Sequence, residues 1–319
     1  MPAISVSAPG KVILFGEHAV VYGRPALAVP IFEVQAKAIV MANPHAAPGT
    51  VRIQAPGIGL EATLADLPEQ DPIAVVVKNV LATLNICRAP ALTLRITSTI
   101  PIAAGLGSGA AVSVAVIRAL STFLGSPLTA EQVSALAYEG EKIHHGTPSG
   151  IDNTVITYGK PVYFKRHNAD RVTLETFDIQ RPFRLVIADS GIPSPTAKVV
   201  AEVRQRWQEA NPAYERLFDE IGAIAEAARQ AIEKGYVEQL GTLMNENQRL
   251  LKEMGVSSPE LERLISAARQ AGASGAKLSG AGQGGNIIAL VSDETVEVVR
   301  QALQQAGAQR IILTTVKQR

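Results

Sequence analysis

The chain reads Pro101-Ile102-Ala103-Ala104-Gly105-Leu106-Gly107-Ser108-Gly109-Ala110-Ala111 directly before an apolar segment. That segment, about residues 110–124, has the length and composition of an α-helix. Glycine lets backbone N–H groups turn toward a ligand, and the N-terminus of the following helix adds the positive end of its dipole. The stretch therefore predicts an anion site, typically for phosphate. The pattern G-x-x-x-x-G-K-[ST] of the common P-loop does not occur in the chain, which excludes that class.

The same glycines also satisfy G-x-G-x-x-[GA], the loose pattern of a dinucleotide-binding loop, over Gly105 to Ala110. That pattern belongs in a tight turn at the end of a strand, whereas Pro101 and further residues separate it from the preceding strand here. A second helix is also expected next, where a dinucleotide fold requires a strand with an acidic ribose ligand. We therefore reject an NAD-dependent dehydrogenase as the interpretation of this loop.

Composition restricts the class of protein. The 319 residues are 47% hydrophobic and 18% charged with a formal net charge of +1, which is typical of a globular protein with a sizeable core. Lysines and arginines are spread along the chain, so we expect no nucleic acid partner. No apolar run reaches the ~18 residues of a membrane helix, no secretory signal is visible, and Cys87 is the single cysteine. We expect a cytoplasmic protein without a membrane partner.

Hydrophobic periodicity predicts an α+β chain of two domains, residues 1–180 and residues 181–319. Strands are expected over residues 4–15 with a break at Pro9-Gly10, 26–40 with a bend at Pro30, 91–99, 185–188, 287–291 and 310–316, and a hairpin with its turn at Ala55-Pro56-Gly57 is expected over residues 51–64. Helices are expected over residues 72–85 with Asp71 as the cap, 110–124, 129–143, 196–209, 212–234, 236–254, 259–271 and 294–306. In the helix over residues 212–234, apolar residues at helical spacing from Leu217 to Ile232 predict a buried stripe. The second domain is therefore the richer in helices.

A second candidate site surrounds the short apolar strand at residues 12–15. Lys11 precedes this strand, and Glu17 and His18 follow it beside Gly16. A lysine, an acid and a histidine this close in sequence can supply charge and proton transfer to one site. The alternative, an exposed strand flanked by solvated charges, fits these residues equally well when they are considered alone.

A third candidate site lies at the end of the helix expected over residues 129–143. Glu141 lies on this helix, and a loop rich in glycine, proline and serine follows it and presents Asp152. A surface loop with a capping aspartate is the alternative interpretation. The pair His144-His145 near Glu141 suggests zinc, but the sequence has neither H-E-x-x-H nor H-x-x-E-H here, and no third ligand is evident.

Taken in order, these motifs resemble those of the GHMP kinases, a superfamily that includes galactokinases and homoserine kinases. A fourth motif adds to the resemblance, because the chain continues Lys277-Leu278-Ser279-Gly280-Ala281-Gly282-Gln283-Gly284-Gly285, similar to the family's C-terminal glycine motif. Residues 16–23 and 145–153 resemble the forms found in the members that phosphorylate mevalonate. The resemblance covers nearly the whole chain. It implies a mixed α/β N-terminal domain and a helix-rich, ferredoxin-like C-terminal domain, with the active site between them.

The resemblance also implies roles for individual residues. Asp152 would lie near the acceptor hydroxyl group as base or orienting group, and Lys11 beside it would stabilise the transferring charge. The acceptor would be bound by Glu17, His18, Thr196 and Ala281. Mg²⁺ would be held by Ser108 and Glu141. ATP would bind the first glycine loop, through Pro101, Ala104, Gly105, Leu106, Gly107, Ser108, Gly109 and Ala110.

The implied function is ATP-dependent phosphorylation of the 5-hydroxyl group of mevalonate, in the synthesis of isoprenoid precursors. The alternatives are another small hydroxylated acceptor, the 3-hydroxyl group of mevalonate, or a non-catalytic metabolite sensor on the same fold. A homodimer is one expected assembly. Two residues depart from the family's pattern. Gly109 stands where a second serine often supplies a metal ligand, and Gln283 replaces a glycine, adding bulk where the C-terminal motif approaches substrate.

Overall fold

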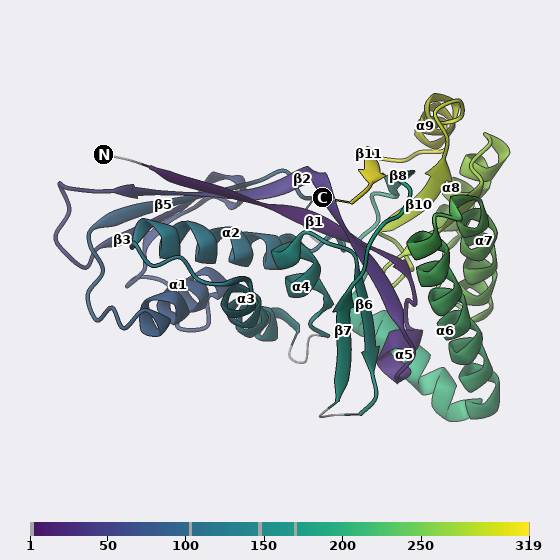
Figure 1. Cartoon of the computed structure of the whole chain (residues 1–319), viewed down its shortest axis with the longest axis horizontal. Helices are drawn as coiled ribbons and strands as arrows, with labels where there is room; N and C mark the ends of the chain where they lie inside the picture. Colours follow the sequence, from purple (N-terminus) through teal and green to yellow (C-terminus); the bar gives the residue numbers. More distant parts are fainter. Residues whose placement is uncertain (1–2, 102–103, 146–148, 169–170, 319) are drawn as a thin grey trace. The chain divides into compact units, whose positions relative to one another are not determined.

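The computed structural model describes residues 3–101, 104–145, 149–168 and 171–318, without the side chains of residues 144 and 145. The chain forms two compact units (Figure 1). The first unit comprises Met1–Lys11, Val34–Pro101 and Leu106–Gly159, and the second comprises Val12–Glu33, Ile102–Gly105 and Lys160–Arg319. The chain therefore enters each unit more than once. The division into one domain over residues 1–180 and another over residues 181–319 stays a prediction.

The first unit contains strands in the order β4-β3-β5-β2, and β1 pairs with β2. The bounds are β1 (Ile4–Phe15), β2 (Ala26–Ala42), β3 (Val51–Ala55), β4 (Leu60–Thr63) and β5 (Leu92–Ser98). Strand β5 pairs antiparallel with residues 36–42 of β2 and parallel with β3. The predicted hairpin at residues 51–64 is confirmed, because β3 and β4 pair antiparallel across the short 3₁₀ turn η2 (Pro56–Ile58).

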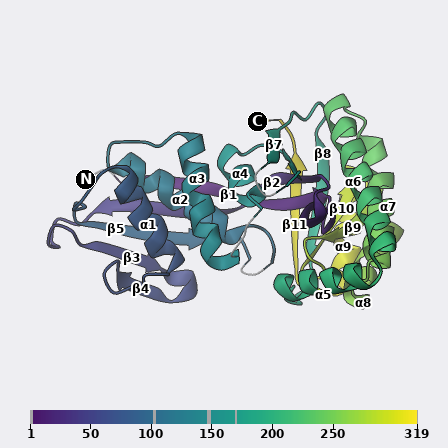
Figure 2. The ribbon, with the colours of Figure 1, turned by 90° about the horizontal axis from the view of Figure 1, so that it is seen from below.

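The helices of the first unit are α1 (Pro72–Thr83), α2 (Ser108–Phe123), α3 (Ala130–His145) and α4 (Ile151–Tyr158). Helices α1, α2 and α3 pack on one another, and α2 also contacts β5 (Figure 2). Asp71 caps α1 as predicted, since its Oδ1 accepts hydrogen bonds of 2.9 Å from the N–H groups of Ile73 and Ala74. Helix α2 is buried along most of its length, which holds its N-terminus rigidly behind the glycine loop.

The second unit contains a four-stranded antiparallel sheet in the order β11-β8-β10-β9. Its strands are β8 (Phe183–Asp189), β9 (Gly275–Ser279), β10 (Asn286–Val291) and β11 (Arg310–Val316). The first residues of β2 also belong to this unit and pair antiparallel with β6 (Val162–Arg166), which pairs in turn with β7 (Val172–Thr176). Sequence periodicity missed β6, β7 and β9, which are only five residues long each.

The helices of the second unit are α5 (Thr196–Glu209), α6 (Asn211–Lys234), α7 (Val237–Glu253), α8 (Pro259–Gln270) and α9 (Val296–Gln305). All five were predicted within two residues of their observed ends. The predicted apolar stripe of α6, from Leu217 to Ile232, is buried. Helices α7 and α8 contact β9, α8 also contacts β10, and α9 contacts β8 and β11. These helices therefore cover the antiparallel sheet.

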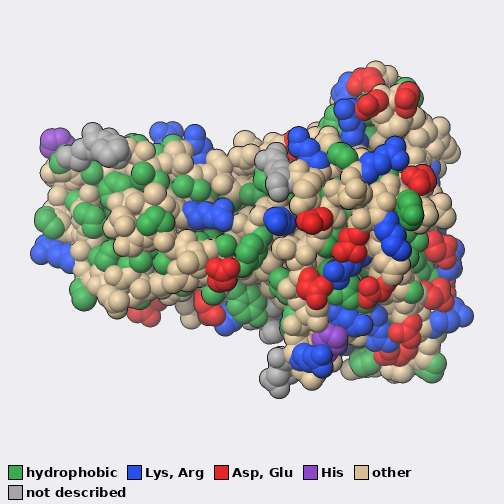
Figure 3. Space-filling view, in the orientation of Figure 1, with side chains coloured by type: hydrophobic (Ala, Val, Ile, Leu, Met, Phe, Trp, Pro, Cys, Tyr) green, Lys and Arg blue, Asp and Glu red, His purple; other side chains and the backbone are tan. Residues whose placement is uncertain are grey.

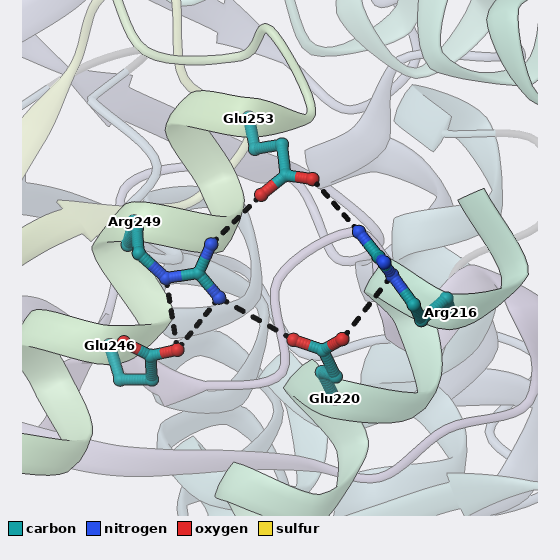
Figure 4. A network of polar contacts seen from close by, with 5 residues as sticks. All are labelled: Arg216, Glu220, Glu246, Arg249 and Glu253. Atoms are coloured by element: carbon teal, nitrogen blue, oxygen red, sulfur yellow. Dashed lines mark hydrogen bonds and ion pairs between the residues drawn. The ribbon is translucent and has the colours of Figure 1, made fainter. Parts of the chain in front are cut away.

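The exposed faces of α6 and α7 carry a network of ion pairs (Figure 4). Arg249 contacts three carboxylates, those of Glu246 at 2.7 Å, Glu253 at 2.9 Å and Glu220 at 3.5 Å. Arg216 contacts Glu220 at 3.4 Å and Glu253 at 3.3 Å, which closes the network between the two helices. Because these side chains are 41–67% exposed, solvent screens their attraction.

Two predicted strand interruptions are wrong. Strand β1 runs through Pro9-Gly10, and β2 runs through Pro30 without a break. Proline is tolerated in a strand where its missing N–H group is not required by a neighbour. Pro30 meets this condition with respect to β5 and β6, because residues 26–28 of β2 pair with β6 and residues 36–42 pair with β5. Pro30 therefore lies on β2 between its pairing with β6 and its pairing with β5.

Charged side chains of both signs are interspersed on the surface. Among the side chains coloured by type in Figure 3, lysines and arginines alternate with acidic residues over the helices of the second unit. This distribution accords with the formal net charge of +1. In the described part of the chain, no helix combines the length and the apolar character that a bilayer crossing demands.

Candidate active site

One group of predicted site residues is an ion pair within the first unit. Lys11 lies on β1 with its side chain 9% exposed, and its Nζ lies 3.1 Å from Oδ1 of Asp152. Asp152 lies in the first turn of α4, which begins after Gly150 at φ +88°. The positive end of the helix dipole stabilises a carboxylate at this position. The loop predicted to present Asp152 is therefore wrong: a helix fixes the carboxylate beside Lys11.

The first glycine loop lies against Lys11 in the same unit. Gly107 is the N-cap of α2 at φ +73°, and a Cβ atom there would lie 2.9 Å from Cγ of Lys11 and 3.0 Å from Cδ1 of Ile156. Any larger residue would combine backbone strain with displacement of the lysine stem. The backbone N–H of Lys11 also donates a hydrogen bond of 3.0 Å to the carbonyl of Leu106. The N–H groups that open α2 thus follow directly after a loop fastened to the lysine.

The other residues predicted to bind ATP are distributed along this loop. Ser108 opens α2 and is half-buried, Gly109 is exposed and Ala110 is buried. Pro101 belongs to the first unit, whereas Ala104 and Gly105 belong to the second, where the buried Nδ2 of Asn286 donates to the carbonyl of Ala104. Ile102 and Ala103 lie outside the described residues. An anion would therefore meet mainly backbone groups and one hydroxyl group along the described part of the loop.

Glu141 is a buried carboxyl group on α3, with only 5% of the residue exposed. Burial raises the pKa of Glu141 to about 7, the charge of Asp152 contributes in the same direction, and Lys11 opposes both. A carboxyl group in this setting gains from a nearby cation, and the oxygens of Glu141 and Ser108 are of the kind that Mg²⁺ prefers. The donor chemistry therefore fits the predicted magnesium ligands, and their role stays a prediction.

The zinc hypothesis concerned side chains that the structure does not describe. The side chains of His144 and His145 and the whole of residues 146–148 lie outside the described part. Within the described part, no group of three or more histidine, cysteine, aspartate and glutamate side chains is placed to hold a metal ion.

A separate group of predicted site residues lies in the second unit, where Glu17 pairs with Lys277. The Nζ of Lys277 donates to Oε1 of Glu17 and, at 2.6 Å, to the carbonyl of Leu278. The two side chains are 0% and 1% exposed. Lys277 enters the sequence motifs only as the first residue of the second glycine motif, with no role predicted for its side chain. The available signal was a lysine between Ala276 and Leu278, in a short apolar segment where a charge needs a partner.

His18 adopts an unusual backbone conformation directly after Glu17. Its φ of +60° and ψ of −49° lie in a region that residues other than glycine rarely adopt, at a cost of about 1–3 kcal/mol. Its Nε2 lies 2.7 Å from the carbonyl oxygen of Ala281. Burial lowers the pKa of His18, so the ring is neutral at pH 7. Because a carbonyl can only accept, Nε2 carries the proton and Nδ1 is the acceptor nitrogen.

The remaining predicted residues lie near the start of α5. Thr196 is the first residue of this helix and is exposed, and the hydroxyl group of Ser194 donates to the carbonyl of Gly282 at 2.7 Å. Gln283 has a positive φ of +54°, and its Nε2 donates to Oε2 of Glu202 on α5 at 2.9 Å. The added bulk of Gln283 is thus used to connect the second glycine motif to α5. Thr196 and Ala281 are brought to neighbouring segments of the second unit.

Known proteins match this chain over nearly its whole length. The models of the GHMP kinases N-terminal domain and the GHMP kinases C-terminal domain match residues 73–160 and 228–309. A mevalonate kinase of Thermococcus sibiricus is 36% identical over 97% of this chain and 95% of its own length. A mevalonate kinase of Aeropyrum pernix is 37% identical over 96% of this chain and 94% of its own length.

A solved structure agrees with these sequence matches. The crystal structure of L. major mevalonate kinase in complex with R-mevalonate is 34% identical to this chain. It aligns with a TM-score of 0.84, covering 98% of this chain and 95% of its own. The resemblance read from the four motifs is thereby confirmed. Since both family domains match in order and relatives above 30% identity span almost the entire chain, the protein belongs to the GHMP kinase family of ATP-dependent kinases.

Proposed function

We propose that this chain transfers the γ-phosphoryl group of ATP to the 5-hydroxyl group of mevalonate. The observation that carries the proposal is the pairing of Lys11 with Asp152 at 3.1 Å, against a glycine loop that opens a helix. This set supplies an ammonium, a carboxylate and backbone N–H groups, which suit phosphoryl transfer. The named mevalonate kinases that align over nearly the whole chain support the choice of acceptor.

In the proposed reaction, the hydroxyl oxygen of the acceptor forms a bond to the γ-phosphorus. The bond from that phosphorus to the β,γ-bridging oxygen breaks, ADP leaves, and the hydroxyl proton passes to Asp152. The carboxylate also orients the hydroxyl group, which matters because phosphoryl transfer through a loose transition state requires little base assistance. Lys11 stabilises the negative charge on the transferring group, and its buried stem keeps the ammonium in place.

Two further groups of residues complete the proposal. The N–H groups at the start of α2 bind the phosphates of ATP, since a helix N-terminus favours negative charge. Ser108 and Glu141 would hold Mg²⁺, which neutralises phosphate charge when it is bound. We assign direct binding of the acceptor to His18, Thr196 and Ala281, because His18 offers a neutral ring nitrogen as hydrogen-bond acceptor for a hydroxyl group. Glu17, which the sequence also predicted to bind the acceptor, has a side chain only 1% exposed and would act through its neighbour His18. A homodimer and a cytoplasmic location stay predictions.

The test is ³¹P NMR of the product formed from the purified protein, Mg-ATP and racemic mevalonate. We expect a new phosphomonoester signal coupled to a CH₂ group, together with one equivalent of ADP. A phosphomonoester without proton coupling would instead identify the tertiary 3-hydroxyl group as the acceptor. If mevalonate is not phosphorylated while another small alcohol is, the proposed acceptor is wrong and the kinase chemistry stands. If ATP stays intact with every acceptor, a metabolite sensor on the same fold replaces the proposal.

A further inference from the structure

A fully buried lysine lies in the second unit outside the set of residues that the proposed reaction uses. Lys277 lies on β9 opposite Ile288 of β10, with its side chain 0% exposed. Its ammonium donates to Glu17 and to the carbonyl of Leu278. Glu17 is itself 1% exposed, so the pair is sealed from solvent. An ammonium enclosed in this way acts through its protein neighbours rather than by touching a substrate.

The pair acts together with a second bond between β9 and the end of β1. The hydroxyl group of Ser279 donates to the carbonyl of Ile13 at 2.8 Å, four residues before Glu17. Lys277 lies on the same strand as Ser279, and its ammonium holds the carboxylate of Glu17. Because 260 residues separate Lys277 from Glu17, this contact fixes the start of the chain against one of its last strands. The backbone that leaves β1 therefore has a defined exit direction.

The residue immediately after this fixed point is the strained His18. A residue other than glycine persists at φ +60° and ψ −49° only where its surroundings leave no relaxed alternative. Two such constraints flank His18: the carboxylate of Glu17 on one side, and the bond of its own Nε2 to the carbonyl of Ala281 on the other. The turn is further closed by a bond of 2.9 Å from the N–H of Val21 to the carbonyl of His18.

We propose that Lys277 is a positioning residue: by anchoring Glu17, it holds His18 in its strained conformation, with the Nε2 proton directed at Ala281 and Nδ1 presented to the acceptor. The part of this proposal that concerns the acceptor rests on the proposed function. The part that concerns the conformation and tautomer of His18 does not. Lys277 contributes to acceptor binding without contacting the acceptor.

A purely structural role for the ion pair is the competing explanation. Removing one partner of a buried pair leaves an uncompensated charge, so Lys277→Met alone is expected to destabilise the fold. The double variant Lys277→Met/Glu17→Gln removes both charges and keeps the approximate volumes. Replacement of a whole buried pair by uncharged residues is often tolerated. The double variant therefore separates the loss of positioning from the loss of stability.

Two measurements on the double variant test the proposal. The first is a long-range ¹H–¹⁵N spectrum of histidine-labelled protein, in which His18→Gln assigns the His18 signal among the five histidines of the chain. The second is steady-state kinetics with mevalonate and ATP varied separately. Tyr163→Phe is the matched control, because it removes a part-buried bond of 2.6 Å to Glu226 elsewhere in the second unit.

In the wild-type protein we expect a single neutral His18 tautomer with the proton on Nε2. In the double variant we expect exchange between tautomers, a rise of at least ~10-fold in the KM for mevalonate, corresponding to about one lost hydrogen bond, and little change in the KM for ATP. Tyr163→Phe should leave both readouts unchanged. A wild-type His18 signal together with an unchanged KM for mevalonate in the folded double variant would overturn the proposal. If the wild-type protein does not use mevalonate, the proposed function fails, and the His18 tautomer alone decides whether Lys277 positions it.

Discussion

Two lysines in this molecule share a carboxylate partner but differ in what surrounds the pair. Lys11 pairs with Asp152, whose side chain is 29% exposed, whereas Lys277 pairs with Glu17, which is 1% exposed. The first pair can exchange its internal contact for one with a ligand, because solvent and small molecules reach the carboxylate. The second pair cannot. The comparison teaches that a buried charge pair in a kinase can serve either the reaction or the geometry, and that access to its carboxylate distinguishes the two roles.

The two regions also differ in their effect on stability. Near Lys11, Glu141 supplies a second carboxyl group, which is buried. Its burial and the charge of Asp152 both disfavour the charged form of Glu141. Near Lys277, each charge has one buried partner of opposite sign. Burial nevertheless lowers the pKa of Lys277, so both centres retain an electrostatic penalty. Near Lys277 the opposite charge of Glu17 reduces this penalty, whereas near Lys11 the charge of Asp152 adds to the penalty on Glu141.

The largest effect is expected where the carboxylate is accessible. Asp152→Asn should lower kcat by at least ~10²-fold, because the amide can neither accept the hydroxyl proton nor pair with Lys11 as a carboxylate does. Single-turnover kinetics with Mg-ATP and mevalonate measure this change. Asp66→Asn, on an exposed turn of the same unit, is the control and should keep wild-type turnover. Near-normal kcat in Asp152→Asn would show that the accessible pair of Lys11 and Asp152 does not serve the reaction.

The next largest effect is expected on the free energy of unfolding, through the electrostatic penalty of the buried Glu141 near Lys11. Because the pKa of Glu141 is raised from 4.5 to about 7 in the folded protein, the folded state holds a proton that the unfolded state releases between these values. The free energy of unfolding should therefore fall as pH rises from about 4.5 to 7 and then level off. Glu141→Gln should be more stable than the wild-type protein by up to about 3 kcal/mol at pH 8, the free energy that corresponds to this shift. It should also lose this part of the pH dependence.

Urea denaturation of the metal-free and nucleotide-free proteins at pH 5 and pH 8 checks this prediction. The difference between the two proteins should shrink toward pH 5, where the carboxyl group is protonated in the folded state. Glu139→Gln on the same helix carries its charge at the surface, in an exposed pair with Lys142, and serves as the control. If the Glu141→Gln protein is less stable than the wild-type protein at pH 8, burial of the Glu141 charge near Lys11 carries no electrostatic penalty.

The smallest effect is expected in the exposed network of α6 and α7. Arg249→Ala removes contacts with three carboxylates, yet screening by water should limit the loss to below about 1 kcal/mol in the free energy of unfolding. Thermal denaturation in 50 mM and 1 M NaCl tests this, because the difference from the wild-type protein should vanish at high salt. A larger loss that persists in high salt would mean that the number of ion pairs matters more than their burial.

Much of the fold could be predicted from local sequence signals. The stripe of α6 and the cap at Asp71 depend on residues within a few positions of one another, and both are confirmed. The failures involve partners far along the chain. Pro9 and Pro30 break a strand only if a neighbour requires their N–H groups, and the sequence does not say which neighbour will be there. Helix α4 was missed because its eight residues follow a segment rich in turn-forming residues.

The candidate site divides in the same way. Lys11, Glu141 and Asp152 could be proposed because charged residues next to glycine-rich loops form a pattern in sequence. The pairing of Lys277 with Glu17 could not, because it depends on the register between β9 and β10 and on the path of β1. Local chemistry predicts which groups are present, and tertiary packing determines which of them are sealed and which are accessible.

The interleaving of the two units has a consequence for synthesis on the ribosome. Residues 12–33 belong to the second unit and include the buried run Ala26–Ile31, yet most of that unit begins at Lys160. At roughly 5–20 residues per second, this apolar segment waits for many seconds before its partners emerge. The nascent chain thus exposes an apolar, strand-forming segment early, before most of the unit that buries it has been made. Truncation at residue 180 would keep β6, with which residues 26–28 pair, and would remove the antiparallel sheet and the helices of the second unit.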